Sequence, residues 1–121
     1  MFVEESGKGE LIMLSPQIST EIADAMRSVF GEQLVSVVLY GSAARGENTP
    51  ESDVDLALFL RAPMTPEQFD HMASWFAEAG LKYDMVFSPI DIEQSMFDKW
   101  VEAMPFYQNI RKEGIVLWKA A

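Results

Sequence analysis

Two aspartates separated by one residue carry the clearest chemical signal in the chain. Asp53 and Asp55 stand at the start of a strand-forming run, residues 53–60 (DVDLALFL). Alternate residues of a β-strand point to the same face, so both carboxylates are expected there, with Cα atoms roughly 6.5–7 Å apart. Two such anions repel each other unless a cation lies between them, and oxygen ligands of this kind suit Mg²⁺ or Mn²⁺. A solvated strand start without metal is the alternative, and the pair alone leaves both open.

A Gly–Ser pair directly after another strand could hold phosphate. Residues 34–40 (LVSVVLY) are rich in β-branched and aromatic residues, which predicts a buried strand, and Gly41 and Ser42 follow it. Glycine lets backbone N–H groups approach a ligand closely, and the free N–H groups of a following helical turn favour an anion. The Ser42 hydroxyl adds a donor. An ordinary turn is the alternative, because Gly–Ser alone is a weak signal.

Arg45 lies one turn beyond this pair. Its planar guanidinium could contact phosphate oxygens. It could equally brace the loop by pairing with Glu47, Glu51 or Asp53.

Asp84 is the third candidate carboxylate, and it lies within residues 82–88 (KYDMVFS), a predicted third strand. If that strand lies beside the second, Asp84 could face the aspartate pair. Three carboxylates could then hold two metal ions about 3.5–4 Å apart, the arrangement used for in-line phosphoryl displacement. The alternative is a structural role in which Lys82 is the partner of Asp84.

The elements that position these residues follow from apolar spacing, capping residues and Gly or Pro breaks. Helices are predicted over 16–30, 66–79, 91–103 and 106–113, strands over 34–40, 53–60 and 82–88, and an extended piece over 115–118. We expect Ser15 and Thr65 to cap helices, Gly31, Gly80 and Gly114 to end them, and Pro89 to end the third strand.

The links between the strands indicate the topology. The link between the first two is too short for a parallel crossover, which favours antiparallel pairing. The helix between the second and third permits a parallel pair. The predicted class is α+β, with a small mixed sheet and helices packed on one face.

Composition sets further bounds. The 121 residues predict one domain spanning 1–121, with residues 1–14 as a loose lead-in and 11–14 as an optional edge strand. The net charge of −10 argues against a non-specific nucleic-acid binder and favours metal ions or a basic partner. The chain has no cysteine, which excludes disulfides and thiolate metal sites. No targeting or membrane-spanning segment is visible, so we expect a cytoplasmic protein.

The spaced motif resembles a known family. Gly41-Ser42, ten residues, and then Asp53-Val54-Asp55 are similar to the minimal nucleotidyltransferases of the DNA polymerase β-like superfamily. The stretch LYGSAARGENTPESDVDLAL matches that core closely. The resemblance extends to the region of Asp84 and to the closing NIRKEGIVLW, and so covers nearly the whole chain.

The resemblance implies transfer of a nucleotidyl group from a nucleoside triphosphate to a hydroxyl, with two Mg²⁺ ions, or Mn²⁺ in their place. It implies that Gly41 and Ser42 hold the β- and γ-phosphates and that Asp53 and Asp55 ligate the metals. It further implies that Asp84 completes the second metal site and helps to deprotonate the acceptor. ATP is the expected nucleotide, although none of these residues reads a base.

Stand-alone members of this size resemble the MntA-like antitoxins of two-component systems, whose partner is an all-helical HEPN ribonuclease toxin. There the antitoxin adds AMP to a tyrosine of the toxin, and a basic, RNA-cleaving partner would suit the charge of −10. Two alternatives stay open: a non-catalytic module that blocks a partner by contact, and a small-molecule nucleotidyltransferase with a separate acceptor subunit. Methionines and aromatics such as Trp100 and Phe106 are candidates for gripping an acceptor, although core packing explains most of them.

Overall fold

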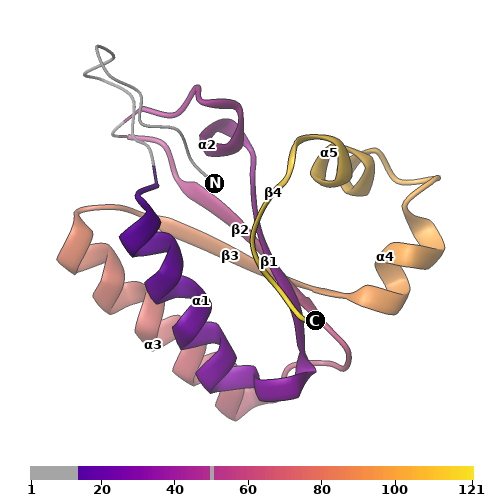
Figure 1. The fold of residues 1–121 in the computed structure, drawn as a ribbon, viewed down its shortest axis with the longest axis horizontal. Coiled ribbons are helices and arrows are strands. Elements are labelled where there is room, and N and C mark those ends of the chain that lie inside the picture. Colours follow the sequence, from indigo (N-terminus) through magenta and orange to yellow (C-terminus); the bar gives the residue numbers. More distant parts are fainter. Residues whose placement is uncertain (1–13, 50) are drawn as a thin grey trace.

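The computed structural model describes residues 14–49 and 51–121, which build one mixed sheet flanked by helices (Figure 1). The strands, in the spatial order β3-β2-β1-β4, are β1 (Leu34–Tyr40), β2 (Val54–Leu60), β3 (Phe87–Glu93) and β4 (Ile115–Lys119). The helices are α1 (Pro16–Phe30), α2 (Ser42–Arg45), α3 (Pro66–Tyr83), α4 (Gln94–Trp100) and α5 (Pro105–Glu113), with a 3-10 turn, η1, at Gly31–Gln33.

The pairing of the strands follows the predicted topology. β1 pairs antiparallel with β2 and with β4, whereas β2 and β3 are parallel. The predicted α+β class with a small mixed sheet is therefore confirmed. Within the described part of the chain, no helix is both long and apolar enough to cross a membrane.

The two faces of the sheet carry different layers. On one face, α1 and α3 cover a core that includes Ile22, Met26 and Leu56, none of which is exposed to solvent. On the other face, a smaller cluster around Phe59 and Ile110 lies under α4 and α5. Figure 1 shows α1 and α3 together on one side of the sheet and α4 and α5 on the other. The structure thus adds a second helical layer to the predicted one.

The first helix begins and ends where its flanking residues predict. The Ser15 hydroxyl accepts a hydrogen bond from the Ile18 N–H at 3.2 Å, and Pro16 opens the helix. Gly31 ends it with a φ of 57°, a left-handed value that glycine adopts without strain.

The third helix is longer than predicted. Its start is confirmed, because Thr65 and Gln68 form a reciprocal capping box. Gly80, however, does not end it: the helix runs to Tyr83, and Asp84 follows with a φ of 55°. A glycine inside a helix costs only about 1 kcal/mol, and Tyr83 and Lys82 both contact Glu21 of α1, which holds the last turn in place.

The prediction of a strand at 82–88 was therefore wrong, since β3 begins at Phe87. Pro89 does not end β3 but lies within it, opposite Leu56 of β2. β3 is an edge strand. A proline is tolerated there because its missing N–H can face away from the neighbouring strand.

The C-terminal helices and strand are those that the sequence predicts, but their first residues differ from the predicted ones. Residues 91–93 still belong to β3, so α4 begins at Gln94 rather than at 91 and ends at Trp100 rather than at 103. Pro105 opens α5, and the extended piece after it forms β4 against β1. The optional edge strand at 11–14 lies, apart from Leu14, outside the described residues.

Candidate active site

The two aspartates of the motif lie together where β2 begins. Asp55 is the second residue of β2 and is in register with Tyr40 of β1 and Ser88 of β3. Asp53 immediately precedes the strand, and its carboxylate accepts a hydrogen bond of 2.9 Å from the Ser88 hydroxyl. The intervening Val54 is buried in the core on the other face of the sheet. Strand alternation thus places both carboxylates on the side of α4 and α5.

The two negative charges of Asp53 and Asp55 repel each other. Burial raises the pKa of Asp55, the nearby charge of Asp53 raises it further, and Arg45 acts in the opposite direction. Holding both groups ionised therefore costs free energy in the protein alone. A divalent cation would relieve that cost. Mg²⁺ is commonly held by one or two carboxylates together with substrate phosphates, so the donor set fits this ion.

Gly41 connects the aspartate pair to the proposed phosphate seat. It follows β1 with a φ of 76° and precedes α2, whose first residue is Ser42. A Cβ atom added to Gly41 would run into the carboxylate of Asp55. Glycine is thus required here both by the backbone conformation and by the close approach of Asp55. The structure therefore brings Gly41 to Asp55 of the pair, and Ser42 is the next residue in the chain.

Arg45, at the end of α2, binds two carboxylates. Its Nε lies 2.9 Å from Glu47 and its Nη1 lies 3.0 Å from Glu113 at the end of α5. The bracing role is thus observed for Glu47, as the sequence suggested, and extends to Glu113, which the sequence did not indicate. Contact of Arg45 with phosphate stays a prediction.

Asp84 is not brought into the same cluster. It follows the last turn of α3, three residues before β3 begins. Across residues 14–49 and 51–121 there is no group of three or more Asp, Glu or His side chains that could hold a metal ion. The expected three-carboxylate arrangement depended on a strand at 82–88. Because β3 starts later, Ser88 stands opposite Asp55 instead. A catalytic role for Asp84 stays a prediction.

Sequence reasoning overlooked two residues beside the pair. The Ser88 hydroxyl orients Asp53, and Tyr40 stands next to Asp55. Burial and the charge of Asp55 raise the pKa of Tyr40. The ring of Tyr40 meets Phe106 of α5 edge to face, with 5.7 Å between ring centres. The position of Tyr40 beside Asp55 could have been predicted, because the short link between β1 and β2 favours their antiparallel pairing. The position of Ser88 could not, because it depends on the register between β2 and β3.

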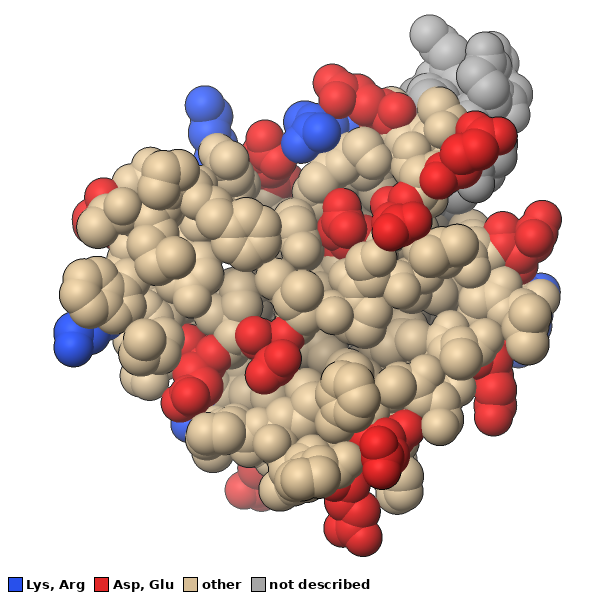
Figure 2. All heavy atoms as spheres, turned by 180° about the vertical axis from the view of Figure 1, so that it is seen from behind, with Lys and Arg blue, Asp and Glu red and all other residues tan. Residues whose placement is uncertain are grey.

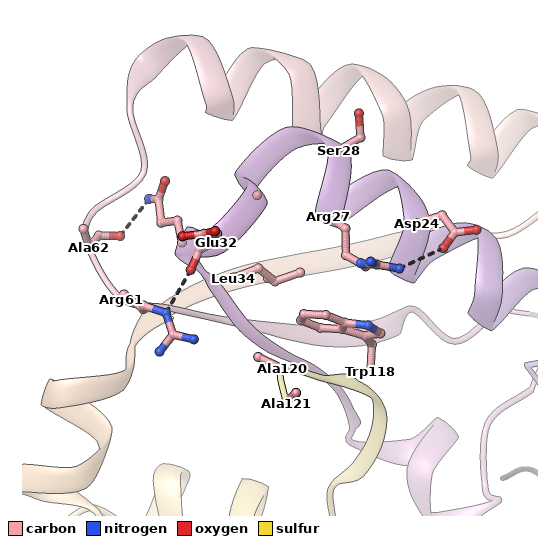
Figure 3. Close-up of a pocket in the computed structure, with 12 residues that line it drawn as sticks. Asp24, Arg27, Ser28, Glu32, Leu34, Arg61, Ala62, Trp118, Ala120 and Ala121 are labelled. Atoms are coloured by element: carbon pink, nitrogen blue, oxygen red, sulfur yellow. Dashed lines mark hydrogen bonds and ion pairs between the residues drawn. The ribbon is translucent and has the colours of Figure 1, made fainter.

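A separate cavity of about 1020 Å³ lies at the opposite end of the sheet (Figure 3). It is lined by Leu34, where β1 begins, and by Arg61, which follows the end of β2. The guanidinium of Arg27 lies 5.3 Å from the ring centre of Trp118 there. This cavity does not include the aspartate pair, so its volume does not identify the active site.

Comparison with known proteins decides the family. The model of the family described as "Nucleotidyltransferase domain" matches residues 19–113, which include Gly41, Ser42 and the aspartate pair. This chain belongs to the nucleotidyltransferase domain family. The resemblance seen in the sequence is thereby confirmed, and the chain is an enzyme of the nucleotidyltransferase class.

Two relatives from Methanocaldococcus jannaschii support this assignment. The nucleotidyltransferase is 30% identical over 98 residues to the protein named "Putative protein adenylyltransferase MJ0604", covering 81% of this chain and 92% of the relative. It is 26% identical over 91 residues to "Putative protein adenylyltransferase MJ0141", covering 75% and 92%.

Solved structures share the fold of the nucleotidyltransferase. A mutant of the MntA–HpeT toxin–antitoxin pair aligns with a TM-score of 0.60 at 14% identity, covering 84% of this chain and 73% of that chain. A toxin–antitoxin structure with AMP-PNP gives 0.59 at 16% identity with the same coverage. A tri-AMPylated Shewanella oneidensis HEPN toxin in complex with its MNT antitoxin gives 0.55 at 15% identity, covering 88% and 74%.

Proposed function

We propose that this nucleotidyltransferase transfers AMP from ATP, with Mg²⁺, to a tyrosine hydroxyl of a partner HEPN ribonuclease toxin and thereby acts as its antitoxin. The observation that supports the proposal is the close approach of the Asp55 carboxylate to Gly41 in a chain of this family. A phosphate seat at Gly41 and a cation site at the aspartate pair would then be adjacent, and transfer from a nucleoside triphosphate requires both.

Each residue of the site would have a distinct task. Asp53 and Asp55 would hold Mg²⁺, and Ser88 would keep Asp53 in its orientation. Gly41 and Ser42 would bind the β- and γ-phosphates. When bound, the ion neutralises the charge of the triphosphate and makes the α-phosphorus more electrophilic.

The reaction is an in-line displacement. The acceptor oxygen attacks the α-phosphorus and forms a new P–O bond, while the bond from the α-phosphorus to the α,β-bridging oxygen breaks. Pyrophosphate leaves with that oxygen and its electron pair. The hydroxyl proton passes to a base. The resemblance assigns this role to Asp84, which would have to approach the pair when the acceptor binds, because the structure does not place it in that cluster.

The identity of the acceptor is supported by the relatives. Two of them are named as protein adenylyltransferases, and one structural neighbour is an antitoxin in complex with a tri-AMPylated HEPN toxin. The net charge of −10 suits a basic, RNA-cleaving partner.

Incubation with ATP labelled at the α-phosphate, Mg²⁺ and a candidate HEPN protein tests the proposal. Label on a tyrosine of the HEPN protein is the expected result. A stable complex without label would instead identify a non-catalytic antitoxin, and label on a metabolite or antibiotic would identify a small-molecule enzyme. The variant in which both Asp53 and Asp55 are changed to Asn is the control for label that does not depend on the site.

A further inference from the structure

The two strands beside Asp55 do not offer it another carboxylate. Asp55 of β2 is in register with Ser88 of β3 on one side and with Tyr40 of β1 on the other. Neighbouring strands lie about 4.8 Å apart, so the residues at these two positions are the nearest to Asp55 across the sheet. One of them is an alcohol and the other is a phenol.

The Ser88 side chain faces the aspartate pair. Its hydroxyl donates a hydrogen bond of 2.9 Å to the carboxylate of Asp53. The alternation along β3 agrees with this direction, because Phe87 packs on the α1–α3 core and Ile90 on the cluster under α4 and α5. Ser88 thus binds one aspartate and stands opposite the other. A neutral donor occupies the place at which β3 could have supplied a third carboxylate.

Other acidic residues do not supply that ligand. The chain has 19 of them, but Figure 2 shows acidic side chains spread over the face seen from behind. No three Asp, Glu or His side chains in the described ranges form a group that could hold an ion. On β3, Asp91 lies between two isoleucines that pack under α4 and α5, so its side chain is on the opposite face. Glu47 and Glu113 are paired with Arg45.

The number of ligands limits the number of ions. Two ions about 3.5–4 Å apart must share their protein ligands, whereas one Mg²⁺ is commonly held by one or two carboxylates together with substrate phosphates. We propose that the site holds a single divalent cation, which binds with the triphosphate, and that Ser88 is the positioning residue that keeps Asp53 directed at it. This inference rests on the proposed function and replaces the two ions that the resemblance implies by one.

Counting ions per bound nucleotide tests the proposal. The purified chain is dialysed to equilibrium against Mn²⁺ and the α,β-methylene analogue of ATP, in which the bond that transfer breaks cannot be cleaved. The excess of each on the protein side gives the ratio of bound Mn²⁺ to bound analogue. We expect a ratio of one for the wild type and of two for Ser88→Asp, which places a carboxylate opposite Asp55.

Ser52→Asp is the control for added charge. Ser52 directly precedes the pair in the chain, and its hydroxyl accepts a hydrogen bond of 3.0 Å from the Thr49 N–H, which a carboxylate can also accept. This variant has the same charge as Ser88→Asp, but the new group does not stand opposite Asp55. Its ratio should therefore stay at one.

Two further variants test the hydrogen bond to Asp53. Ser88 is partly exposed on an edge strand, so the fold should tolerate its replacement. Ser88→Ala should keep the ratio of one but raise the Kd for Mn²⁺ about tenfold, because a ligand carboxylate loses the group that orients it. Ser88→Thr retains a hydroxyl and should restore the affinity, which a purely structural effect of the substitution would not predict.

The ion count needs no acceptor, so it separates this inference from the proposed function. If the wild type binds the analogue with one Mn²⁺ but labels no HEPN protein, the proposed acceptor is wrong and the single-ion site stands. If the wild type does not bind the analogue with Mn²⁺, both fail. A ratio of two in the wild type or in Ser52→Asp, or of one in Ser88→Asp, would overturn the single-ion site. Equal Mn²⁺ affinity in Ser88→Ala and the wild type would overturn the role of Ser88.

Discussion

The two faces of the sheet are built for different purposes, although one strand serves both. On the α1–α3 face, Leu56 and Leu58 of β2 are fully buried in a core to which the described part of the chain contributes fifteen buried residues. On the α4–α5 face, the smaller cluster has five buried residues from the same part of the chain, and beside it the start of β2 presents Asp55 next to Asp53. Burial of apolar surface stabilises the first face, whereas like charges destabilise the second.

This difference shows how a small chain can carry an unfavourable charge cluster. Because the α1–α3 face holds most of the buried apolar side chains, the other face can keep two repelling carboxylates for chemistry. Substitutions of the carboxylates should therefore lower activity and leave the fold intact, whereas substitutions in the α1–α3 core should lower stability. The predictions below run from the largest expected effect to the smallest.

Changing both Asp53 and Asp55 to Asn should lower the transfer rate by about a thousandfold or more, because the carboxylates that hold Mg²⁺ are lost. The fold should persist, since neither side chain belongs to the core, and circular dichroism and Tm measure this. Mg²⁺ with ATP should raise the Tm of the wild type but not that of the variant. Wild-type transfer by the double variant would refute the metal site.

Leu56→Ala should have the opposite pattern. Removing a fully buried side chain from the α1–α3 core should lower the free energy of unfolding by about 2–5 kcal/mol. Chemical denaturation measures the loss. The transfer rate of the fraction that stays folded should remain near that of the wild type, and a comparable loss of stability from Asp55→Asn would remove the contrast between the faces.

Asp84→Asn should lower the transfer rate by about a hundredfold, which is typical for loss of a general base. The rise in Tm with Mg²⁺ and ATP should stay as in the wild type, because Asp84 lies outside the aspartate pair. An unchanged transfer rate would exclude Asp84 from the reaction. If Mg²⁺ and ATP no longer raised the Tm of the variant, Asp84 would instead be identified as a ligand of the ion or the nucleotide.

Gly41→Ala and Gly46→Ala compare the two glycines that flank α2. Gly46, with φ 72° and ψ 24°, is in the left-handed helical region, where the substitution should cost about 1–2 kcal/mol of stability. Gly41, with φ 76° and ψ −154°, has a conformation that is essentially restricted to glycine, so its substitution should cost more. Only at Gly41 would the new Cβ collide with Asp55, whereas the space around Gly46 is open. We therefore expect Gly41→Ala to lower transfer at least about tenfold relative to Gly46→Ala, and equal rates in the two variants would contradict the contact.

The smallest expected effect is a pH-dependent gain in stability from Asp55→Asn. The pKa of Asp55 is raised in the folded protein, so the folded state binds the proton more tightly than the unfolded state. Ionisation of Asp55 therefore reduces stability as the pH rises above about 3.9. The Asn variant should have the higher Tm at pH 7 without Mg²⁺, and the gain should vanish at low pH. A Tm difference independent of pH would show that charge is not its cause.

Local sequence was sufficient to predict most helices and strands and to identify Asp53, Asp55, Gly41 and Ser42 as candidate site residues. The cap at Ser15 and the capping box at Thr65 depend on groups within three residues, so they could be recognised without tertiary information. The face shared by Asp53 and Asp55 follows from the two-residue period of a strand. Their spacing from Gly41 and Ser42 was enough to indicate the family, which the match over residues 19–113 confirms.

Tertiary contacts decided the remainder, because they depend on partners far away in sequence. Contacts from α1 hold the last turn of α3 beyond Gly80, which delays β3 and places Ser88 rather than Asp84 opposite Asp55. Arg45 turns to Glu113, 68 residues further along the chain. Strand alternation and capping act over a few residues, whereas helix ends and strand register are chosen by the packing of whole elements.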